Sequence, residues 1–310
     1  GALRIFLKNT MRREKAMNVR PQPVPGPKRP VSPPRKPLPK GAWDCHAHVF
    51  GPFDRFPVSD ERRYEPPLAP VEDYLAMLDT VGFANGVIVH ASAKGFDMSN
   101  VADALARRPD TLVGVAVVAP DADDAEFSRL HDQGFRAIRF TENGGHSGRS
   151  FGTLYFDDLA RLAPRLKEMG WHAQIWGRCD FIMNERQALD SYNLPLVFDH
   201  LGYVEAAKGV DDRVFQTFLA WVSTGDYWVK TTPVRISKTA PDYPEARPFF
   251  EALLRQVPDR LLFGSDWPYL SLDAAPPDVG HMVDLLDSWT GDDSLRQKMF
   301  VDNPNAFYRR

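Results

Sequence analysis

The chain has 310 residues, a length that suits one α/β barrel with an additional tail. Hydrophobic residues make up 43% and charged residues 25% of it, as in ordinary globular proteins, and the formal net charge of −3 predicts neither nucleic acid nor an anionic membrane as a partner. Its two cysteines, Cys45 and Cys179, exclude a disulfide framework or a thiolate zinc site and indicate a reducing, cytoplasmic location. No apolar run approaches the roughly 20 residues of a membrane span.

Residues 1–40 are predicted to form a basic, proline-rich arm, and residues 41–310 the folded domain. The second half of the arm, residues 21–40, contains nine prolines. Proline lacks the amide hydrogen that helices and sheets need, so this half favours extended polyproline II. We expect the arm to contribute little to the core and to lie on the body or on a partner subunit, which leaves a homodimer open. Its second half also carries Lys28, Arg29, Arg35 and Lys36.

From residue 42 onwards, short apolar runs rich in β-branched residues alternate with helical patterns. The predicted strands are 42–49, 84–91, 112–119, 137–142, 172–177, 195–200, 227–233 and 261–266. The predicted helices are 70–81, 98–108, 123–133, 155–169, 181–191, 211–223, 245–256 and 278–289. This alternation predicts an α/β fold of the (β/α)8 TIM-barrel type. A doubly wound open sheet is the alternative, but no G-x-G-x-x-G follows the first strand.

The first predicted strand carries the pattern Asp-x-His-x-His. Because side chains alternate between the two faces of a strand, Asp44, His46 and His48 are expected on one face, and Cys45 and Ala47 on the other. Two imidazoles and a carboxylate are poor core material. Two histidines bonded to backbone carbonyls at a strand end would also account for this pair. Other residues of the chain are therefore needed to distinguish a functional site from a structural one.

Polar side chains recur where the other predicted strands end. In a (β/α)8 barrel these carboxyl ends meet at one mouth, where the chemistry takes place. Core histidines would instead scatter over strand positions. The strand ends supply His46, His48, Ser92, Arg139, Trp176, Asp199, His200, the segment 230–235, and Asp266.

With His-x-His on strand 1, His200 on strand 6 and Asp266 on strand 8, the chain resembles the amidohydrolase superfamily. DCHAHVFGP, Arg63-Tyr64, FDHLG and FGSDWP resemble the 2-pyrone-4,6-dicarboxylate lactonase branch more closely. The resemblance covers residues 42–308. It implies an amidohydrolase-like barrel and a hydrolase that opens an anionic lactone, as in bacterial catabolism of aromatic compounds.

The metal content can be argued from the ligands that this superfamily uses. Binuclear members need a bridging Lys or Glu on strand 4 and a His on strand 5, where this chain has Arg139 and Trp176. His172 is near the start of strand 5 and should point away from the site. The lactonase branch, as the resemblance implies, works without metal, so no cofactor is expected. The alternative is one divalent ion such as zinc, held by His46, His48, His200 and Asp266.

The residue types then suggest roles in opening a lactone. Hydrolysis needs a base for water and donors where the oxyanion forms. Asp266 is predicted to be the base, and His46, His48 and His200 are predicted to polarise the carbonyl group.

A second set of residues is predicted to bind the substrate. Arg139 and Arg235 suit substrate carboxylates, because a guanidinium group matches a carboxylate with two hydrogen bonds. Tyr64 matches the tyrosine of the lactonase branch and would donate to a substrate oxygen. The remaining predicted substrate-binding residues are Ser92, Arg149, Trp176, Tyr203 and Tyr269.

Two departures from the branch bear on the substrate. The lactonases read DHxGR and DWPH, whereas this chain has Tyr203 and Tyr269 at the last positions of these motifs. An anionic lactone or related cyclic acid is therefore expected, but with one acidic group recognised differently. A metal-dependent decarboxylase, an aldonolactone isomerase and a non-catalytic binding protein on the same barrel are the alternatives.

Overall fold

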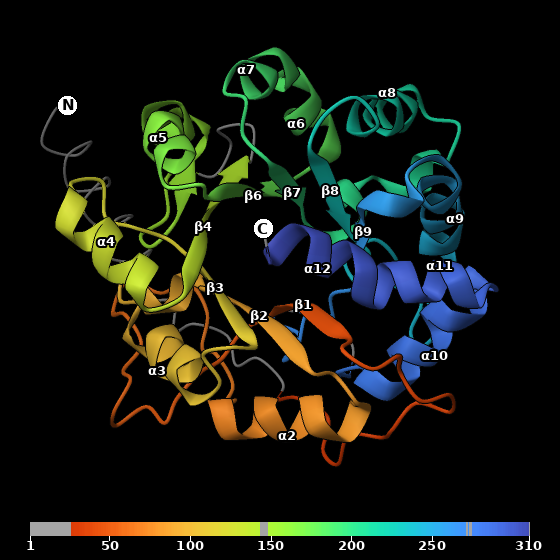
Figure 1. The fold of residues 1–310 in the computed structure, drawn as a ribbon, viewed down its shortest axis with the longest axis horizontal. Helices are drawn as coiled ribbons and strands as arrows, with labels where there is room; N and C mark the ends of the chain where they lie inside the picture. Colours follow the sequence, from red (N-terminus) through yellow and green to blue (C-terminus); the bar gives the residue numbers. More distant parts are fainter. Residues whose placement is uncertain (1–25, 143–147, 271, 273–274, 310) are drawn as a thin grey trace, which may run out of the picture.

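The computed structural model describes residues 26–142, 148–270, 272 and 275–309. Eight parallel strands form the main path of a nearly closed barrel, and helices surround it (Figure 1). The strands are β1 (Trp43–Ala47), β2 (Asn85–Val89), β3 (Leu112–Ala116), β4 (Phe135–Glu142), β6 (His172–Gly177), β7 (Leu196–Phe198), β8 (Tyr227–Lys230) and β9 (Leu261–Leu262). A short strand, β5 (Leu154–Tyr155), pairs with β4 off this path. The predicted (β/α)8 barrel is confirmed.

The ring closes between its last and first strands. Beyond β9 the chain continues beside β1, where Cys45 N donates to Phe263 O at 2.8 Å and His48 N donates to Trp267 O at 2.8 Å. Asp266 N donates to His46 O in the opposite direction, also at 2.8 Å. These bonds fix the segment that carries Asp266 directly beside the two histidines of β1.

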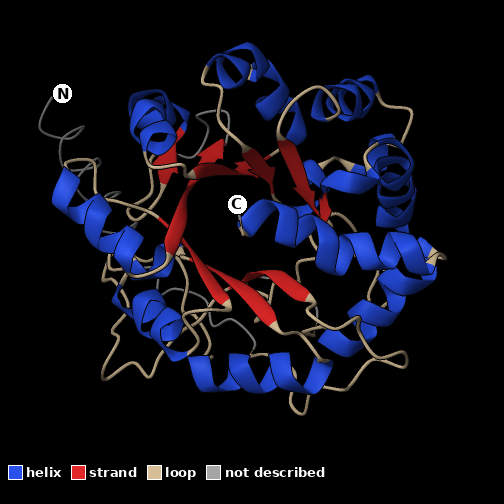
Figure 2. Cartoon of the chain, in the orientation of Figure 1, coloured by secondary structure: helices blue, strands red, loops and turns tan. Residues whose placement is uncertain are grey.

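The helices form an outer ring around the strands (Figure 2). They are α2 (Val71–Val81), α3 (Ser99–Arg107), α4 (Asp124–Asp132), α5 (Phe156–Glu168), α6 (Cys179–Asn184), α7 (Arg186–Ser191), α8 (Arg213–Val222), α9 (Arg247–Gln256), α10 (Val279–Thr290), α11 (Asp293–Gln297) and α12 (Asn303–Tyr308). The predicted helix 181–191 is therefore two short helices that meet at Glu185. Among the described residues, no helix is long and apolar enough to cross a membrane.

Local sequence explains several of these helix boundaries. The side chains of Asp123 and Asp212 accept hydrogen bonds from backbone N–H groups at the starts of α4 and α8, as N-caps should. Gly82 ends α2 with a φ of 99°, in the left-handed region that glycine adopts without a steric penalty.

Helix α12 covers the N-terminal opening of the barrel, which faces the reader in Figure 1. Its Phe307 ring lies 4.9 Å from Trp228 and 4.7 Å from His172, measured between ring centroids. His172 is at the start of β6 and points to this end, as its position in the strand predicted. The predicted functional site is therefore expected at the opposite mouth, which is formed by the carboxyl ends of the strands.

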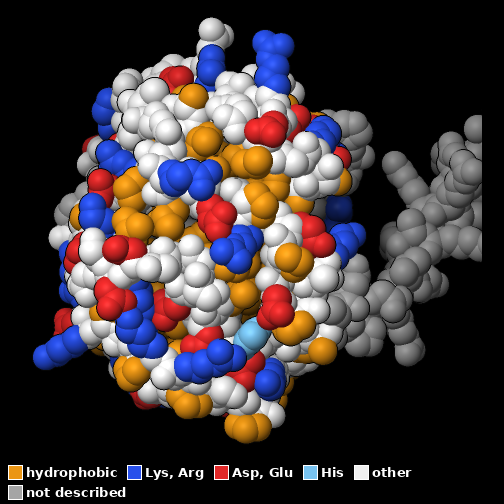
Figure 3. Space-filling model, turned by 90° about the vertical axis from the view of Figure 1, so that its right-hand side faces the viewer, with side chains coloured by type: hydrophobic (Ala, Val, Ile, Leu, Met, Phe, Trp, Pro, Cys, Tyr) orange, Lys and Arg blue, Asp and Glu red, His pale blue; other side chains and the backbone are white. Residues whose placement is uncertain are grey.

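The described part of the arm, residues 26–40, lies against the barrel rather than apart from it. Lys28 pairs with Asp278 at 2.8 Å, and the guanidinium of Arg296 donates to the carbonyls of Lys36 and Pro37 at 3.2 and 2.9 Å. The described part of the arm therefore lies on the body, which is one of the two positions predicted for it. Figure 3 shows the side of the molecule that carries α9 to α11, where acidic and basic side chains are interspersed.

Candidate active site

A cavity of about 460 Å³ opens at the carboxyl ends of the strands. Nine of the predicted residues line it and come from widely separated parts of the chain. They are His48, Tyr64, Ser92, Arg139, Trp176, His200, Tyr203, Arg235 and Asp266. Strand ends distant in sequence thus meet at one mouth, as a (β/α)8 barrel requires.

Three predicted site residues are not among the described residues that line this cavity. His46 is fully buried beneath His48 and Asp266, so it can act only through them. Tyr269 is 1% exposed within the core. Arg149 forms ion pairs with Asp157 and Asp158 on the surface and borders a different depression.

The alternation predicted for β1 is interrupted. The pairing register with β2 shifts between Asp44 and Ala47, as in a β-bulge, which inserts one residue and re-aims its neighbours. Cys45 therefore packs with the residues inside the barrel, while Asp44 turns outward and accepts hydrogen bonds from Ser265 N and Oγ at 2.8 and 2.7 Å. The prediction that Asp44 shares a face with both histidines is wrong.

The same irregularity brings the two histidines together inside the barrel. Their Nε2 atoms lie 3.2 Å apart, and His48 Nδ1 lies 2.7 Å from the carbonyl oxygen of Val89. Gly264 makes room for His46, because an added Cβ there would lie 2.9 Å from the His46 Cβ. Burial lowers the pKa of both His46 and His48 to about 3, so both imidazoles are neutral at pH 7.

Among the described residues that line the cavity, Asp266 is the one carboxylate. Its Oδ1 lies 3.6 Å from His46 Nε2 and 3.7 Å from His48 Nε2, and its Oδ2 accepts a hydrogen bond from Arg235 Nε at 2.6 Å. Burial acts to raise the pKa of Asp266, but the Arg235 charge and the three histidines lower it well below its ordinary value. Asp266 also has a φ of 64°, a left-handed conformation that is uncommon for a residue other than glycine.

A second buried carboxylate, Asp199, lies on the other side of His46. Its Oδ2 accepts from Arg139 Nε at 3.0 Å and from Gln174 Nε2 at 3.2 Å, and its Oδ1 lies 3.6 Å from Lys230 Nζ. Burial acts to raise the pKa of Asp199, whereas Arg139, His46 and Lys230 lower it well below its ordinary value. Asp199 is not among the described residues that line the cavity.

Sequence reasoning gave this second cluster no role. Asp199 and Lys230 were recognised only as strand-end residues, and Gln174 lies in the middle of β6. His90, at the end of β2, also lines the cavity and was not singled out. A lysine and a glutamine within predicted buried strands would have been the available signal, because such groups need buried partners.

Arg139 and Arg235 were predicted to bind substrate carboxylates, and each already forms an ion pair with a carboxylate of the protein. Arg139 pairs with Asp199 and lies 5.7 Å from the Trp176 ring, while Arg235 pairs with Asp266 and donates to Leu270 O at 2.5 Å. Their side chains remain 18% and 15% exposed. A guanidinium group has five N–H donors, so each can still bind an anion in the cavity.

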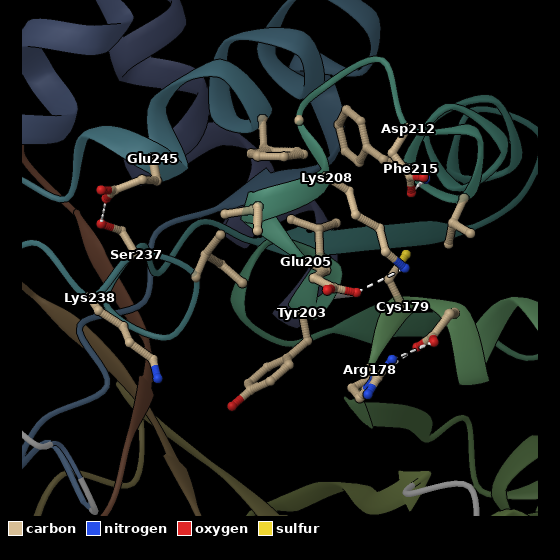
Figure 4. A pocket seen from close by; sticks show the side chains of 18 of the residues that line it. Arg178, Cys179, Tyr203, Glu205, Lys208, Asp212, Phe215, Ser237, Lys238 and Glu245 are labelled. Carbon is tan, nitrogen blue, oxygen red and sulfur yellow. Dashed lines mark hydrogen bonds and ion pairs between the residues drawn. The ribbon is translucent and has the colours of Figure 1, made fainter.

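A second cavity of about 550 Å³ lies behind Tyr203. Figure 4 shows two ion pairs among its charged side chains: Lys208 with Glu205 at 2.9 Å, and Arg178 with Asp180 at 2.6 Å. Of the predicted residues, Tyr203 borders both cavities. Because the candidate base and the histidines lie in the other cavity, we place the site there.

Two groups of three side chains have the composition of a metal site. These are His46, His48 and Asp266, and His46, Asp199 and His200, with ligand atoms within 4.8 Å of one another in each group. The first triangle has sides of 3.2 to 3.7 Å, close to the ligand separation of about 3.3 Å around tetrahedral zinc. The surroundings do not suit an ion, however, because Lys230 Nζ lies 3.1 Å from His46 Nδ1 and two guanidinium groups adjoin the two carboxylates.

Comparison with known proteins agrees with this geometry. Residues 43–310 match the amidohydrolase family. The chain is 31% identical to a 4-sulfomuconolactone hydrolase of Hydrogenophaga intermedia over 95% of this chain and 97% of that one. It is 34% identical to a 2-pyrone-4,6-dicarboxylate hydrolase of Comamonas testosteroni, over 89% and 93%. A crystal structure described as a putative 2-pyrone-4,6-dicarboxylic acid hydrolase from Pseudomonas putida superposes with a TM-score of 0.74, 29% identity and coverage of 88% and 98%.

Proposed function

Because this chain belongs to the amidohydrolase family, we propose that it is a hydrolase that opens an anionic lactone. Its relatives are named for hydrolysis of 4-sulfomuconolactone and 2-pyrone-4,6-dicarboxylate, both cyclic esters with acidic substituents. The cavity suits such a molecule, because Arg139 and Arg235 line it together. These substrates also motivate a role in bacterial catabolism of aromatic compounds.

The observation that carries the proposal is the position of Asp266. It is the carboxylate on the cavity wall, it is 1% exposed, and its Oδ1 faces the Nε2 atoms of both β1 histidines. Its lowered pKa keeps it ionised at pH 7. A carboxylate so placed can accept a proton from a water molecule that attacks a bound carbonyl carbon.

The reaction follows from these groups. Asp266 takes one proton of the water while the hydroxyl oxygen bonds to the lactone carbonyl carbon. The negative charge on the carbonyl oxygen then needs donors, and the candidates on the cavity wall are His200, Tyr64, Arg139 and Arg235. The ring C–O bond breaks, and the proton held by Asp266 passes to the leaving oxygen. The product is an open-chain acid, and no metal ion takes part in these steps.

Tyr203 and Tyr269 contribute unequally to substrate choice. Tyr203 lines the cavity and packs edge-on against Trp176, with the ring centroids 5.7 Å apart. We propose that its hydroxyl replaces a charged contact of the lactonase branch with one neutral hydrogen bond. Tyr269 is buried away from the cavity, so its effect on the substrate must be indirect.

The remaining proposals concern the metal content, the location and the oligomeric state of the enzyme. We propose that it acts without a metal, because of the cations around the candidate ligands. A cytoplasmic location fits the two buried, unpaired cysteines. We also propose a homodimer joined by the arm, and the size of the purified protein tests it.

The test is an assay of the purified chain, treated with a chelator, against 4-sulfomuconolactone, 2-pyrone-4,6-dicarboxylate and aldonolactones. Loss of the lactone absorbance with uptake of one base equivalent per turnover is expected for at least one of the first two. A change of lactone ring without release of acid would indicate an isomerase. Release of carbon dioxide would indicate a decarboxylase, and binding without turnover a non-catalytic protein.

A further inference from the structure

Lys230 is fully buried beneath the candidate site, and the proposed chemistry does not use it. It is the last residue of β8, and its ammonium group donates to Gln174 Oε1 at 2.7 Å. Its Nζ also lies 3.1 Å from His46 Nδ1. A buried lysine is costly unless each of its contacts is favourable. The contact with His46 therefore has to be explained.

The positions of the ring protons can be deduced from the neighbouring groups. A carbonyl oxygen only accepts, so His48 must carry its proton on Nδ1, which faces Val89 O at 2.7 Å. In a neutral imidazole the other nitrogen, His48 Nε2, is then an acceptor. His46 Nε2, 3.2 Å away, must be the donor, which leaves His46 Nδ1 as an acceptor for Lys230. Each of these contacts then joins one donor to one acceptor.

The opposite tautomer of His46, with its proton on Nδ1, would make two contacts unfavourable. A proton on His46 Nδ1 could bond to Asp199 Oδ1 at 3.3 Å, but it would face the donor Nζ of Lys230. The two Nε2 atoms would also face each other as lone pairs 3.2 Å apart. That tautomer is the one a metal ion requires, with a bare Nε2 towards the ion and Nδ1–H bonded to a carboxylate. Lys230 and Asp199 therefore compete for the same nitrogen of His46.

We propose that Lys230 is a positioning residue that holds His46 as its Nε2–H tautomer, and that this proton keeps the triangle of His46, His48 and Asp266 from binding a divalent ion. The same N–H points between His48 Nε2 and Asp266 Oδ1, the two atoms that it can orient for reaction. The inference refines the site of the proposed lactonase and rests on that function only for its effect on turnover.

The proton assignment can be tested on the unaltered protein. Nitrogen-15 NMR of the histidine rings distinguishes a protonated from a bare ring nitrogen, and single-histidine substitutions assign the signals. We expect His46 to be protonated at Nε2 and bare at Nδ1, and His48 to be the reverse. A protonated Nδ1 on His46 would overturn the proposal, whether or not any lactone is hydrolysed.

The metal-exclusion part is tested with Lys230→Met, which keeps an unbranched side chain, one atom shorter, and removes its N–H donors. We expect His46 to move its proton to Nδ1, towards Asp199, and zinc affinity measured by calorimetry to rise by about 10- to 100-fold, the usual effect of a partner of a ligating histidine. Adding Asp199→Leu should abolish this gain, because leucine has nearly the same shape but offers His46 Nδ1–H no oxygen acceptor. Lys94→Met is the matched control, since it also removes a buried lysine but leaves His46 untouched.

Two results would contradict metal exclusion. One is stoichiometric, tight zinc binding by the unaltered protein. The other is a folded Lys230→Met variant with unchanged zinc affinity and an unchanged His46 tautomer. Turnover provides a separate measurement: if no lactone is hydrolysed but the NMR and zinc results are as expected, the proposed function fails and the role of Lys230 stands.

Discussion

Two buried aspartates flank His46, and they differ in what surrounds them. Asp199 and Asp266 are each 1% exposed, and each accepts a hydrogen bond from the Nε atom of an arginine. Asp199 Oδ1 lies 3.3 Å from His46 Nδ1, and Asp266 Oδ1 lies 3.6 Å from His46 Nε2. In both, nearby positive charge lowers the pKa against the effect of burial.

The difference lies in access to the cavity. Asp266 is on the cavity wall, whereas Asp199 is enclosed by Lys230, Gln174 and Arg139. A carboxylate enclosed by donors can hold neighbouring groups in place but cannot reach a water molecule in the cavity. Two chemically identical side chains on either side of one imidazole are thus suited to different tasks, one to proton transfer and one to support.

The largest effect is expected from Asp266→Asn. Asparagine has nearly the same shape but cannot accept a proton from water, so kcat should fall by about 10²- to 10⁴-fold, the usual contribution of a positioned general base. Calorimetry with substrate or product should show nearly unchanged affinity. An Asp266→Asn enzyme with near-normal kcat would remove Asp266 as the base, and the mechanism with it.

Arg139→Met and Arg235→Met should act mainly on binding. A desolvated anion without its charged partner loses about 2–5 kcal/mol. We therefore expect kcat/KM to fall by about 30-fold to several thousand-fold for a lactone with two acidic groups. Comparing it with a lactone that has one acidic group provides the control, because one of the variants should then lose much less. Equal losses on both substrates would mean that neither arginine binds a substrate carboxylate.

Arg235→Met should also shift the pH dependence of activity. Arg235 lowers the pKa of Asp266 in the folded protein, so the active carboxylate persists below the ordinary range of an aspartate. Without that charge the pKa rises, and activity should be lost at a higher pH as the solution is acidified. The measurement is the acidic limb of kcat/KM in both enzymes, and an unmoved limb would show that Arg235 does not control the base.

Asp199→Asn should reduce stability more than chemistry. The substitution removes the carboxylate that Lys230 and Arg139 share. Breaking a buried ion pair lowers the free energy of unfolding by about 3–5 kcal/mol. Denaturant unfolding should show this loss, while kcat falls far less than in Asp266→Asn. The two variants make the same chemical change on either side of His46, so equal losses of kcat would contradict the division of roles.

The sequence predicted the barrel and its mouth because both follow from short-range patterns. Alternating apolar runs placed the eight strands, and strand ends placed seven of the nine predicted lining residues in one cavity, while Tyr64 and Tyr203 came from the family resemblance. The β-bulge that turns Asp44 outward depends on hydrogen bonds to Ser265, more than 200 residues away, so period-two reasoning could not detect it. The cluster of Lys230, Gln174 and Asp199 joins three neighbouring strands, β6 to β8, whose residues are up to 56 positions apart in sequence. Each residue is unremarkable in its own segment.

The smallest effect is expected from removing residues 1–38, and it concerns stability alone. Composition predicted that the arm contributes little to the core, but its described part makes two sets of polar contacts. Asp278 pairs with Lys28 and accepts a hydrogen bond from the backbone N–H of Ser32, and the buried Arg296 donates to two carbonyls of the arm. Water replaces these partners after deletion, so the net loss is that of a few hydrogen bonds, about 1–3 kcal/mol.

We therefore expect Tm to fall by a few degrees, with kcat unchanged because these contacts lie on the outside of the barrel. Lys28→Met is the matched control: it removes one half-exposed ion pair, keeps the backbone contacts, and should leave Tm almost unaltered. If the arm packs on its own subunit, the Tm difference will not depend on protein concentration. A difference that grows with concentration would instead show that the arm stabilises a dimer.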